Sequence, residues 1–177
     1  AGIPCLLFDI NQDAAEKGKE VLLSLKPAPL YKPKNVELIT ACNYQDDLQR
    51  ISETDWILEA VVEQLDIKKK VYSNLLPYLK DSAILTSNTS GIPLNDLTKN
   101  LPTDVKNRFM ITHFFNPPRY MQLLELVKGE HTSESVYNKM ATFGEFDLGK
   151  GIVHAKNTPN FIGNRIGIFG MMTAMNL

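Results

Sequence analysis

The sequence predicts an α/β protein in which helices cover a mostly parallel, doubly wound sheet. Short apolar runs alternate with longer segments of helical period along the 177-residue chain, and this alternation is typical of parallel strands joined by crossover helices. Several runs are continuously apolar, as expected for strands that are buried on both faces. Polar residues collect where these runs end, which is the edge at which such sheets bind ligands.

In the first half of the chain, three apolar runs alternate with two segments of helical period. The run that ends at Asp9 resembles a buried parallel strand, and Pro27 and Pro29 stop the helix that follows it. In the second helix Lys68, Lys69 and Lys70 are expected on the solvent side. We predict strands over residues 5–8, 36–40 and 56–62, helices over 13–25 and 65–79, and a short helix after Asp46 and Asp47.

The second half continues the alternation. Ser133 is a candidate helix cap, and Pro159 lies just ahead of a last apolar helix. We predict strands over 83–86, 109–112, 123–127 and 152–155, a turn over 87–91, and helices over 133–146 and 161–177.

Bulk composition excludes some partners. The net charge is −1, so no overall field attracts the chain to nucleic acid or to an anionic membrane. No apolar run approaches the roughly 18 residues of a membrane span, and we expect no membrane insertion. Cys5 and Cys42 lie in or beside apolar stretches, which favours buried free thiols and a reducing, cytoplasmic location.

The strongest chemical signal is a histidine that closes one apolar run and a glutamate inside the next. His113 precedes an Asn-Pro-Pro turn, which can fold the second run back and place Glu125 beside the imidazole. An imidazole oriented by a carboxylate is the usual form of a general base. The alternative is a core histidine that bonds a backbone carbonyl, with Glu125 facing solvent.

These residues also carry a family resemblance. His113-Phe-Phe-Asn-Pro117, the glutamate twelve positions after the histidine, and Ser87-Asn-Thr-Ser90 resemble the 3-hydroxyacyl-CoA dehydrogenase family. Asn-Pro-Pro-Arg-Tyr and Leu148-Gly-Lys-Gly151 are similar to the dehydrogenase part of bacterial multifunctional fatty-acid oxidation proteins. The resemblance implies a Rossmann-like NAD-binding domain over 1–156, truncated at its N-terminus, and the first helix of a C-terminal all-α domain over 157–177.

The resemblance also implies that NAD is the cofactor. Asp9 would accept the ribose hydroxyls of NAD and repel the phosphate of NADP, although it could also simply open a turn. No Gly-x-Gly-x-x-Gly loop precedes Asp9, so we expect that loop and its strand upstream of residue 1. The other implied cofactor contacts are Ala60, Val61, Glu63, Lys68, Ser90 and Asn116. The alternatives are a solvated helix face for Lys68, a helix cap for Ser90 and an ordinary turn for Asn116.

The implied catalytic residues are His113 as general base, Glu125 as its orienting carboxylate, and Ser90 and Asn164 as contacts of the substrate oxygen. The family pattern Asp-Thr-Pro-Gly-Phe is replaced here by Asn157-Thr-Pro-Asn-Phe161, which keeps Asn164 but leaves the local turn open.

Three functions are consistent with these residues. The first is oxidation of L-3-hydroxyacyl-CoA in fatty-acid β-oxidation by a homodimer or by one part of a larger multifunctional chain. The second is a dehydrogenase of 3-hydroxybutyryl-CoA or a related hydroxy acid, and the third is a non-catalytic dinucleotide-binding relative. The intact set of Ser90, His113, Glu125 and Asn164 disfavours the third. His131 and His154 are expected to be surface or structural residues, and no cluster has metal-ligand spacing.

Overall fold

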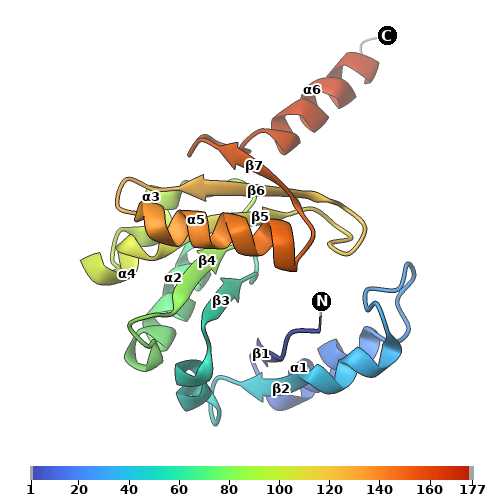
Figure 1. The fold of residues 1–177 in the computed structure, drawn as a ribbon, viewed down its shortest axis with the longest axis vertical. Coiled ribbons are helices and arrows are strands. Elements are labelled where there is room, and N and C mark those ends of the chain that lie inside the picture. The colour runs from blue at the N-terminus through green and yellow to red at the C-terminus, as the bar shows by residue number, and fades with distance from the viewer. Residues whose placement is uncertain (1, 176–177) are drawn as a thin grey trace.

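The computed structural model describes residues 2–175, which form two sheets with flanking helices (Figure 1). In the smaller sheet β1 (Cys5–Asp9) pairs in parallel with β2 (Ile39–Asn43). The larger sheet has the order β3 (Trp56–Glu59), β4 (Ile84–Ser87), β5 (Phe109–Phe114), β6 (Leu123–Lys128) and β7 (Gly151–Ala155). The helices are α1 (Gln12–Val21), α2 (Leu65–Leu75), α3 (Leu94–Thr98), α4 (Thr103–Asn107), α5 (Glu134–Thr142) and α6 (Gly163–Met175).

The strand directions confirm the predicted fold class. β3, β4 and β5 are parallel, β6 runs antiparallel to β5, and β7 is parallel to β6. The carboxyl ends of β3, β4 and β5 therefore meet at one edge of the sheet. Because β6 is antiparallel to β5, the loop after Phe114 and the start of β6 also lie at that edge (Figure 1).

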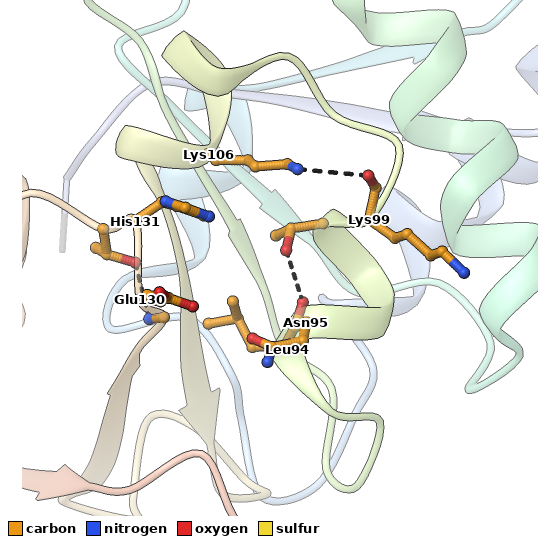
Figure 2. Close-up of a pocket in the computed structure, with 9 residues that line it drawn as sticks. Leu94, Asn95, Lys99, Lys106, Glu130 and His131 are labelled. Atoms are coloured by element: carbon orange, nitrogen blue, oxygen red, sulfur yellow. Dashed lines mark hydrogen bonds between the residues drawn. The ribbon is translucent and has the colours of Figure 1, made fainter.

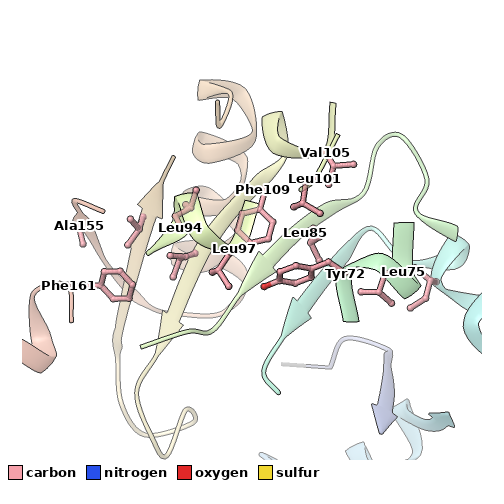
Figure 3. Close-up of a cluster of buried hydrophobic side chains, with 13 residues drawn as sticks. Tyr72, Leu75, Leu85, Leu94, Leu97, Leu101, Val105, Phe109, Ala155 and Phe161 are labelled. Atoms are coloured by element: carbon pink, nitrogen blue, oxygen red, sulfur yellow. The ribbon is translucent and has the colours of Figure 1, made fainter. Parts of the chain in front are cut away.

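Helices cover both faces of the larger sheet. Successive side chains of a strand point to opposite faces, so a single strand contributes to the apolar cluster on each side. On β5, Phe109 and Ile111 belong to the apolar cluster beneath α2, α3 and α4, whereas Met110 belongs to the cluster beneath α5. Figure 3 shows the first cluster, in which Tyr72 of α2 packs edge-on against Phe109 with ring centroids 5.6 Å apart.

Three expectations about the strands are wrong in detail. The strand predicted over 36–40 is a 3₁₀ turn, Pro33–Leu38, and β2 begins only at Ile39. Pro33 at the first position of the turn fixes φ and favours this conformation. β3 ends at Glu59 rather than at residue 62. The strand β1 is only half-buried, since it has β2 as its neighbour on one edge and does not join the larger sheet.

One of the two cysteines differs from expectation. Both are free thiols and Cys42 is buried as predicted, whereas Cys5 is exposed at the start of β1. Burial raises the pKa of the Cys42 thiol above the ordinary value for cysteine, so Cys42 is not an activated nucleophile.

The last helix extends away from the rest of the chain (Figure 1). The predicted helix over 161–177 starts at Gly163, because Asn160 and Phe161 have left-handed φ values of 62° and 47°. Asn176 and Leu177 lie outside the described residues. Large apolar side chains of α6 are exposed, among them Ile166, Phe169, Met171 and Met175. None of the helices described between residues 2 and 175 is long and apolar enough to cross a bilayer.

Candidate active site

The hairpin of β5 and β6 places His113 directly opposite Glu125. The two residues are register partners in the antiparallel pair. Paired residues of an antiparallel ladder point to the same face with short Cβ separations, so their side chains meet. The imidazole Nδ1 lies 2.7 Å from Glu125 Oε2. The predicted contact between the two residues is therefore present.

His113 is held from several sides and is nearly closed off from water. The residue is 3% exposed and Glu125 is fully buried. The imidazole ring of His113 packs edge-on against Phe115, with 4.6 Å between ring centroids. It also packs against the tilted ring of Phe161, with 5.5 Å between centroids. The second ring nitrogen, Nε2, lies 3.1 Å from the hydroxyl of Ser90. The imidazole thus has one polar partner on each nitrogen and aromatic rings against its sides.

The partner of Nδ1 determines which nitrogen can take up a proton. An ionised carboxylate only accepts hydrogen bonds, so the neutral imidazole must carry its hydrogen on Nδ1 to donate to Glu125. Nε2 is then the basic nitrogen, and it faces Ser90 Oγ. In this tautomer the ring can accept a proton from a hydroxyl bound near Ser90.

The other oxygen of Glu125 anchors the start of α6. Oε1 accepts hydrogen bonds from the backbone N–H groups of Ile162 at 2.9 Å and Gly163 at 2.7 Å. Negative charge is favourable at a helix N-terminus, where these N–H groups have no helical partner. A Cβ at Gly163 would lie 2.6 Å from Cζ of Phe115, so the close approach requires glycine. Asn164 follows directly in α6 and is half-buried.

The turn after β4 presents Ser90 to the histidine. Ser90 is exposed, and its backbone N–H donates to Glu63 Oε1 at 2.9 Å. The same oxygen accepts from the N–H of Gly91 at 3.1 Å and from the hydroxyl of Thr89. Burial by itself would raise the pKa of Glu63, but the hydrogen bonds from Thr89 and Lys68 hold that pKa below its ordinary value. Glu63 therefore serves the turn as an ionised acceptor.

The prediction that Lys68 faces solvent is wrong. The structure also adds its partner, Glu59, which the sequence did not indicate. Lys68 is 1% exposed and its ammonium lies 2.7 Å from the buried carboxylate of Glu59. Glu59 is the last residue of β3 and Lys68 lies in the first turn of α2, so the pair joins these two elements. The missed signal is helical spacing, because Leu65, Lys68, Tyr72 and Leu75 fall on one face of α2.

The remaining predicted cofactor residues lie on or beside the carboxyl ends of strands. Asp9 is exposed at the end of β1, and its Oδ1 accepts from the N–H of Ile10 at 2.7 Å. Ala60 is exposed just beyond β3. The N–H of Val61 donates to Glu59 Oε1 and its carbonyl accepts from Lys68. Asn116 is exposed just after β5, three residues beyond His113 in the sequence.

The turn that replaces the family pattern depends on Asn160. Its φ of 62° lies in the left-handed region, which glycine adopts freely and which asparagine tolerates better than most residues. The next residue, Phe161, is buried against His113. Asn160 can therefore stand in the place of the glycine of the family pattern quoted above, because its backbone still makes the bend that turns Phe161 inward.

Replacing Asn160 with glycine is expected to leave the free energy of unfolding within about 1 kcal/mol of the parent, whereas Asn160→Val should lower it by about 1–3 kcal/mol. A β-branched side chain is strained at this φ. Denaturant unfolding of the two variants would measure the difference. Lys156→Val, at an exposed position without a positive φ, is the matched control. Equal stabilities of the Asn160→Val and Asn160→Gly variants would contradict the explanation.

Two features away from His113 do not join this site. A hollow of about 190 Å³ is lined by Lys99, Lys106 and His131, among others, at the opposite end of the β5–β6 hairpin (Figure 2). His154 accepts or donates a hydrogen bond with the hydroxyl of Tyr137 at 2.7 Å, so it has a partner that the sequence did not indicate. Within residues 2–175, no group of His, Cys, Asp and Glu side chains could hold a metal ion.

Chemically, the arrangement suits the removal of a proton from an alcohol. A carboxylate fixes the tautomer of an imidazole, and the free nitrogen faces a serine hydroxyl at the ligand-binding edge of the sheet. The buried aromatic surroundings limit the access of water, and water exclusion strengthens the electrostatic contacts of such a site.

Comparison with known proteins assigns the domain. Residues 1–158 match the family model described as 3-hydroxyacyl-CoA dehydrogenase, NAD binding domain. The chain is 40% identical over 195 aligned positions to a Bacillus subtilis protein named "Probable 3-hydroxyacyl-CoA dehydrogenase", covering 98% of this chain and 25% of that protein. It is 32% identical over 170 positions to the fatty acid oxidation complex subunit alpha of Idiomarina loihiensis, covering 93% of this chain and 23% of that subunit.

A solved structure agrees with these relatives. The crystal structure of (S)-3-hydroxybutyryl-CoA dehydrogenase PaaH1 from Ralstonia eutropha superposes with a TM-score of 0.79 at 28% identity, covering 91% of this chain and 58% of that one. The chain thus spans about a quarter of the length of the two relatives named above.

Proposed function

Because the chain belongs to the 3-hydroxyacyl-CoA dehydrogenase family, we propose that it takes part in the NAD-dependent oxidation of L-3-hydroxyacyl-CoA to 3-oxoacyl-CoA in fatty-acid β-oxidation. The observation that carries the proposal is the line of side chains from Glu125 through His113 to Ser90, with contacts of 2.7 Å and 3.1 Å. It contains the base, its orienting carboxylate and a hydroxyl that can position the substrate oxygen.

In this mechanism His113 removes the proton of the substrate's C3 hydroxyl. Ser90 Oγ holds the substrate oxygen beside Nε2, and Asn164 is a second candidate contact at the start of α6. As the ring takes up the proton, the charge of Glu125 stabilises the imidazolium that forms. A general base of this kind typically contributes about 10²–10⁴-fold to the rate.

The chain's residues fit a dinucleotide at the carboxyl ends of β1 and β3. Tyr44 directly follows β2. Burial raises the pKa of its phenol, and the charges of Asp9 and Glu59 raise that pKa further. Phe8 packs against the same ring with centroids 5.7 Å apart. NAD, when bound, supplies the hydride acceptor for the oxidation. The residues that would hold it are Asp9, Ala60, Val61, Glu63, Ser90 and Asn116.

Replacing Asp9 with alanine is expected to erode a preference for NAD over NADP. A carboxylate accepts the ribose hydroxyls of NAD and repels the additional phosphate of NADP. The ratio of kcat/KM for the two cofactors, measured in the complete protein, should fall toward one in the variant. Asp13→Ala removes an exposed acid in the first turn of α1 and should leave the ratio unchanged. Equal kcat/KM values for the two cofactors in the parent protein would refute this role of Asp9.

The substrate assignment is tested by a series of L-3-hydroxyacyl-CoA thioesters from butyryl to palmitoyl length. NADH formation by the complete protein should be observed with at least one member and should slow by about 10²–10⁴-fold in His113→Gln. Selectivity for the shortest thioester would favour the second candidate, a 3-hydroxybutyryl-CoA dehydrogenase, which is the activity that the Ralstonia enzyme is named for. No turnover with any thioester, despite bound NADH, would overturn the proposed reaction.

We also propose that the chain works as one part of a multifunctional protein or as a homodimer. The Idiomarina relative is named as a subunit of a fatty acid oxidation complex. The exposed apolar side chains of α6 provide a surface that further protein can cover. Sedimentation of the complete protein, together with an assay for enoyl-CoA hydration, would distinguish these arrangements from an isolated monomer.

A further inference from the structure

A buried carboxylate at the end of β3 connects three elements of the fold. Glu59 is 3% exposed, and each of its oxygens accepts two hydrogen bonds. Oε1 accepts from Lys68 Nζ at 2.7 Å and from the N–H of Val61 at 2.8 Å. Oε2 accepts from the hydroxyl of Tyr72 at 2.8 Å and from that of Ser87 at 2.6 Å. Glu59 thus ties α2 to the ends of β3 and β4.

Lys68 directs its ammonium to protein acceptors. Besides Glu59, it contacts Glu63 Oε2 at 3.2 Å and the carbonyl of Val61 at 3.3 Å. An ammonium group has three N–H donors, and here three acceptors surround it inside a side chain that is 1% exposed. Each donor of the ammonium can therefore bond to a protein acceptor.

Through Glu63, the buried pair reaches the turn that carries Ser90. Glu63 uses its second oxygen to accept from the N–H groups of Ser90 and Gly91 and from the hydroxyl of Thr89. Ser90 Oγ in turn lies 3.1 Å from His113 Nε2. The contacts of Glu59, Lys68 and Glu63 are charge-assisted, and they lead from the core to Ser90, whose hydroxyl contacts the basic nitrogen of the site.

We propose that Lys68 and Glu59 are positioning residues, which act through Glu63 to fix Ser90 against His113. The inference rests on the proposed function, since it concerns the placement of the serine that holds the substrate oxygen. Misplacement of a positioned group by about 1 Å can cost about 10²-fold in rate. A residue that orders the turn can therefore control turnover without touching the substrate.

The test uses Lys68→Met in the complete protein, with Lys70→Met on the exposed face of the same helix as control. We expect kcat to fall about 10- to 100-fold in Lys68→Met, with the Kd for NADH changed less than about twofold, and no change in Lys70→Met. Because Lys68 acts through Ser90, adding Ser90→Ala should lower kcat by a much smaller factor in the Lys68→Met background than in the parent protein. Amide hydrogen exchange at Ser90 and Gly91 should accelerate in Lys68→Met, ahead of amides inside β4.

Removing one charge of a buried pair can also unfold the domain. If Lys68→Met gives no cooperative unfolding transition, Tyr72→Phe carries the test, since it deletes a single hydrogen bond to Glu59 without changing any charge. We expect the effects of Tyr72→Phe and Ser90→Ala on kcat to be non-additive in the same way. We also expect amide exchange at Ser90 and Gly91 to accelerate, both on a smaller scale. Full activity of Tyr72→Phe with unchanged exchange would then overturn the inference.

Other outcomes distinguish a failure of this inference from a failure of the proposed function. A tenfold rise in the NADH Kd of Lys68→Met, with additive effects of Lys68→Met and Ser90→Ala, would make Lys68 a cofactor contact and overturn the inference alone. Unchanged kcat in both Ser90→Ala and His113→Gln would instead refute the proposed function.

Discussion

Replacing His113 with glutamine in the complete protein is expected to lower kcat by about 10²–10⁴-fold, with little change in the Kd for NADH. Glutamine can keep a polar contact with Glu125 or Ser90, but its amide cannot take up the proton of the substrate hydroxyl. Steady-state kinetics and NADH titration of the same preparation measure the two quantities. The separation between them is informative because His113 lies on β5, and Asp9 lies on a different sheet.

A matched control is His131→Gln, which changes a histidine that lines the separate hollow of Figure 2. It should leave both kcat and NADH binding unchanged. If His113→Gln weakened NADH binding in proportion to its loss of turnover, His113 would be a structural residue of the cofactor domain, and the assignment of the base would be wrong.

The second large effect is expected for Glu125→Gln, again as a fall in kcat of about 10²–10⁴-fold. The substitution preserves shape but offers an amide in place of a carboxylate. If the amide oxygen keeps the N–H groups of Ile162 and Gly163, its N–H₂ group faces His113 Nδ1. That donor favours the tautomer with hydrogen on Nε2, so the nitrogen that faces Ser90 can no longer accept a proton.

The tautomer itself gives a readout beyond turnover. Nitrogen chemical shifts of His113 should report hydrogen on Nδ1 in the parent protein and on Nε2 in Glu125→Gln. Glu130→Gln, an exposed acid at the far end of the hairpin, is the control and should change neither the shifts nor kcat. An unaltered tautomer together with unaltered kcat would show that Glu125 does not orient the base.

Local patterns predicted those parts of the site that depend on neighbouring strands. The apolar runs around His113 and Glu125, with the Asn-Pro-Pro turn between them, indicated an imidazole–carboxylate contact but left open a core histidine with Glu125 facing solvent. The structure contains the contact. The turn after β4 could likewise be expected at a strand end, and Ser133 caps α5 as predicted, accepting from the N–H of Val136. In each case the required geometry is set within a hairpin or a single helix turn.

Contacts among residues from several elements were not predictable in the same way. Glu59 closes a strand whose other residues are apolar, and nothing in that run identifies Tyr72 and Ser87 as its donors. Lys68 was assigned to solvent because it stands among three consecutive lysines, although α2 rotates each of them to a different side. The shift of β2 to Ile39 has a similar cause, since proline at the start of the 3₁₀ turn outweighed a short alternating pattern.

The carboxylate of Glu125 serves two neighbours with one negative charge, and this makes the two contacts thermodynamically linked. Oε2 binds the imidazole of His113, while Oε1 holds the N–H groups of Ile162 and Gly163 that begin α6. Linkage is reciprocal. If displacement of α6 alters the proton affinity of His113, then protonation of His113 alters the hold on α6 by the same free energy. Under that condition, the hold of Glu125 on the last helix depends on the charge state of an imidazole in the body of the domain.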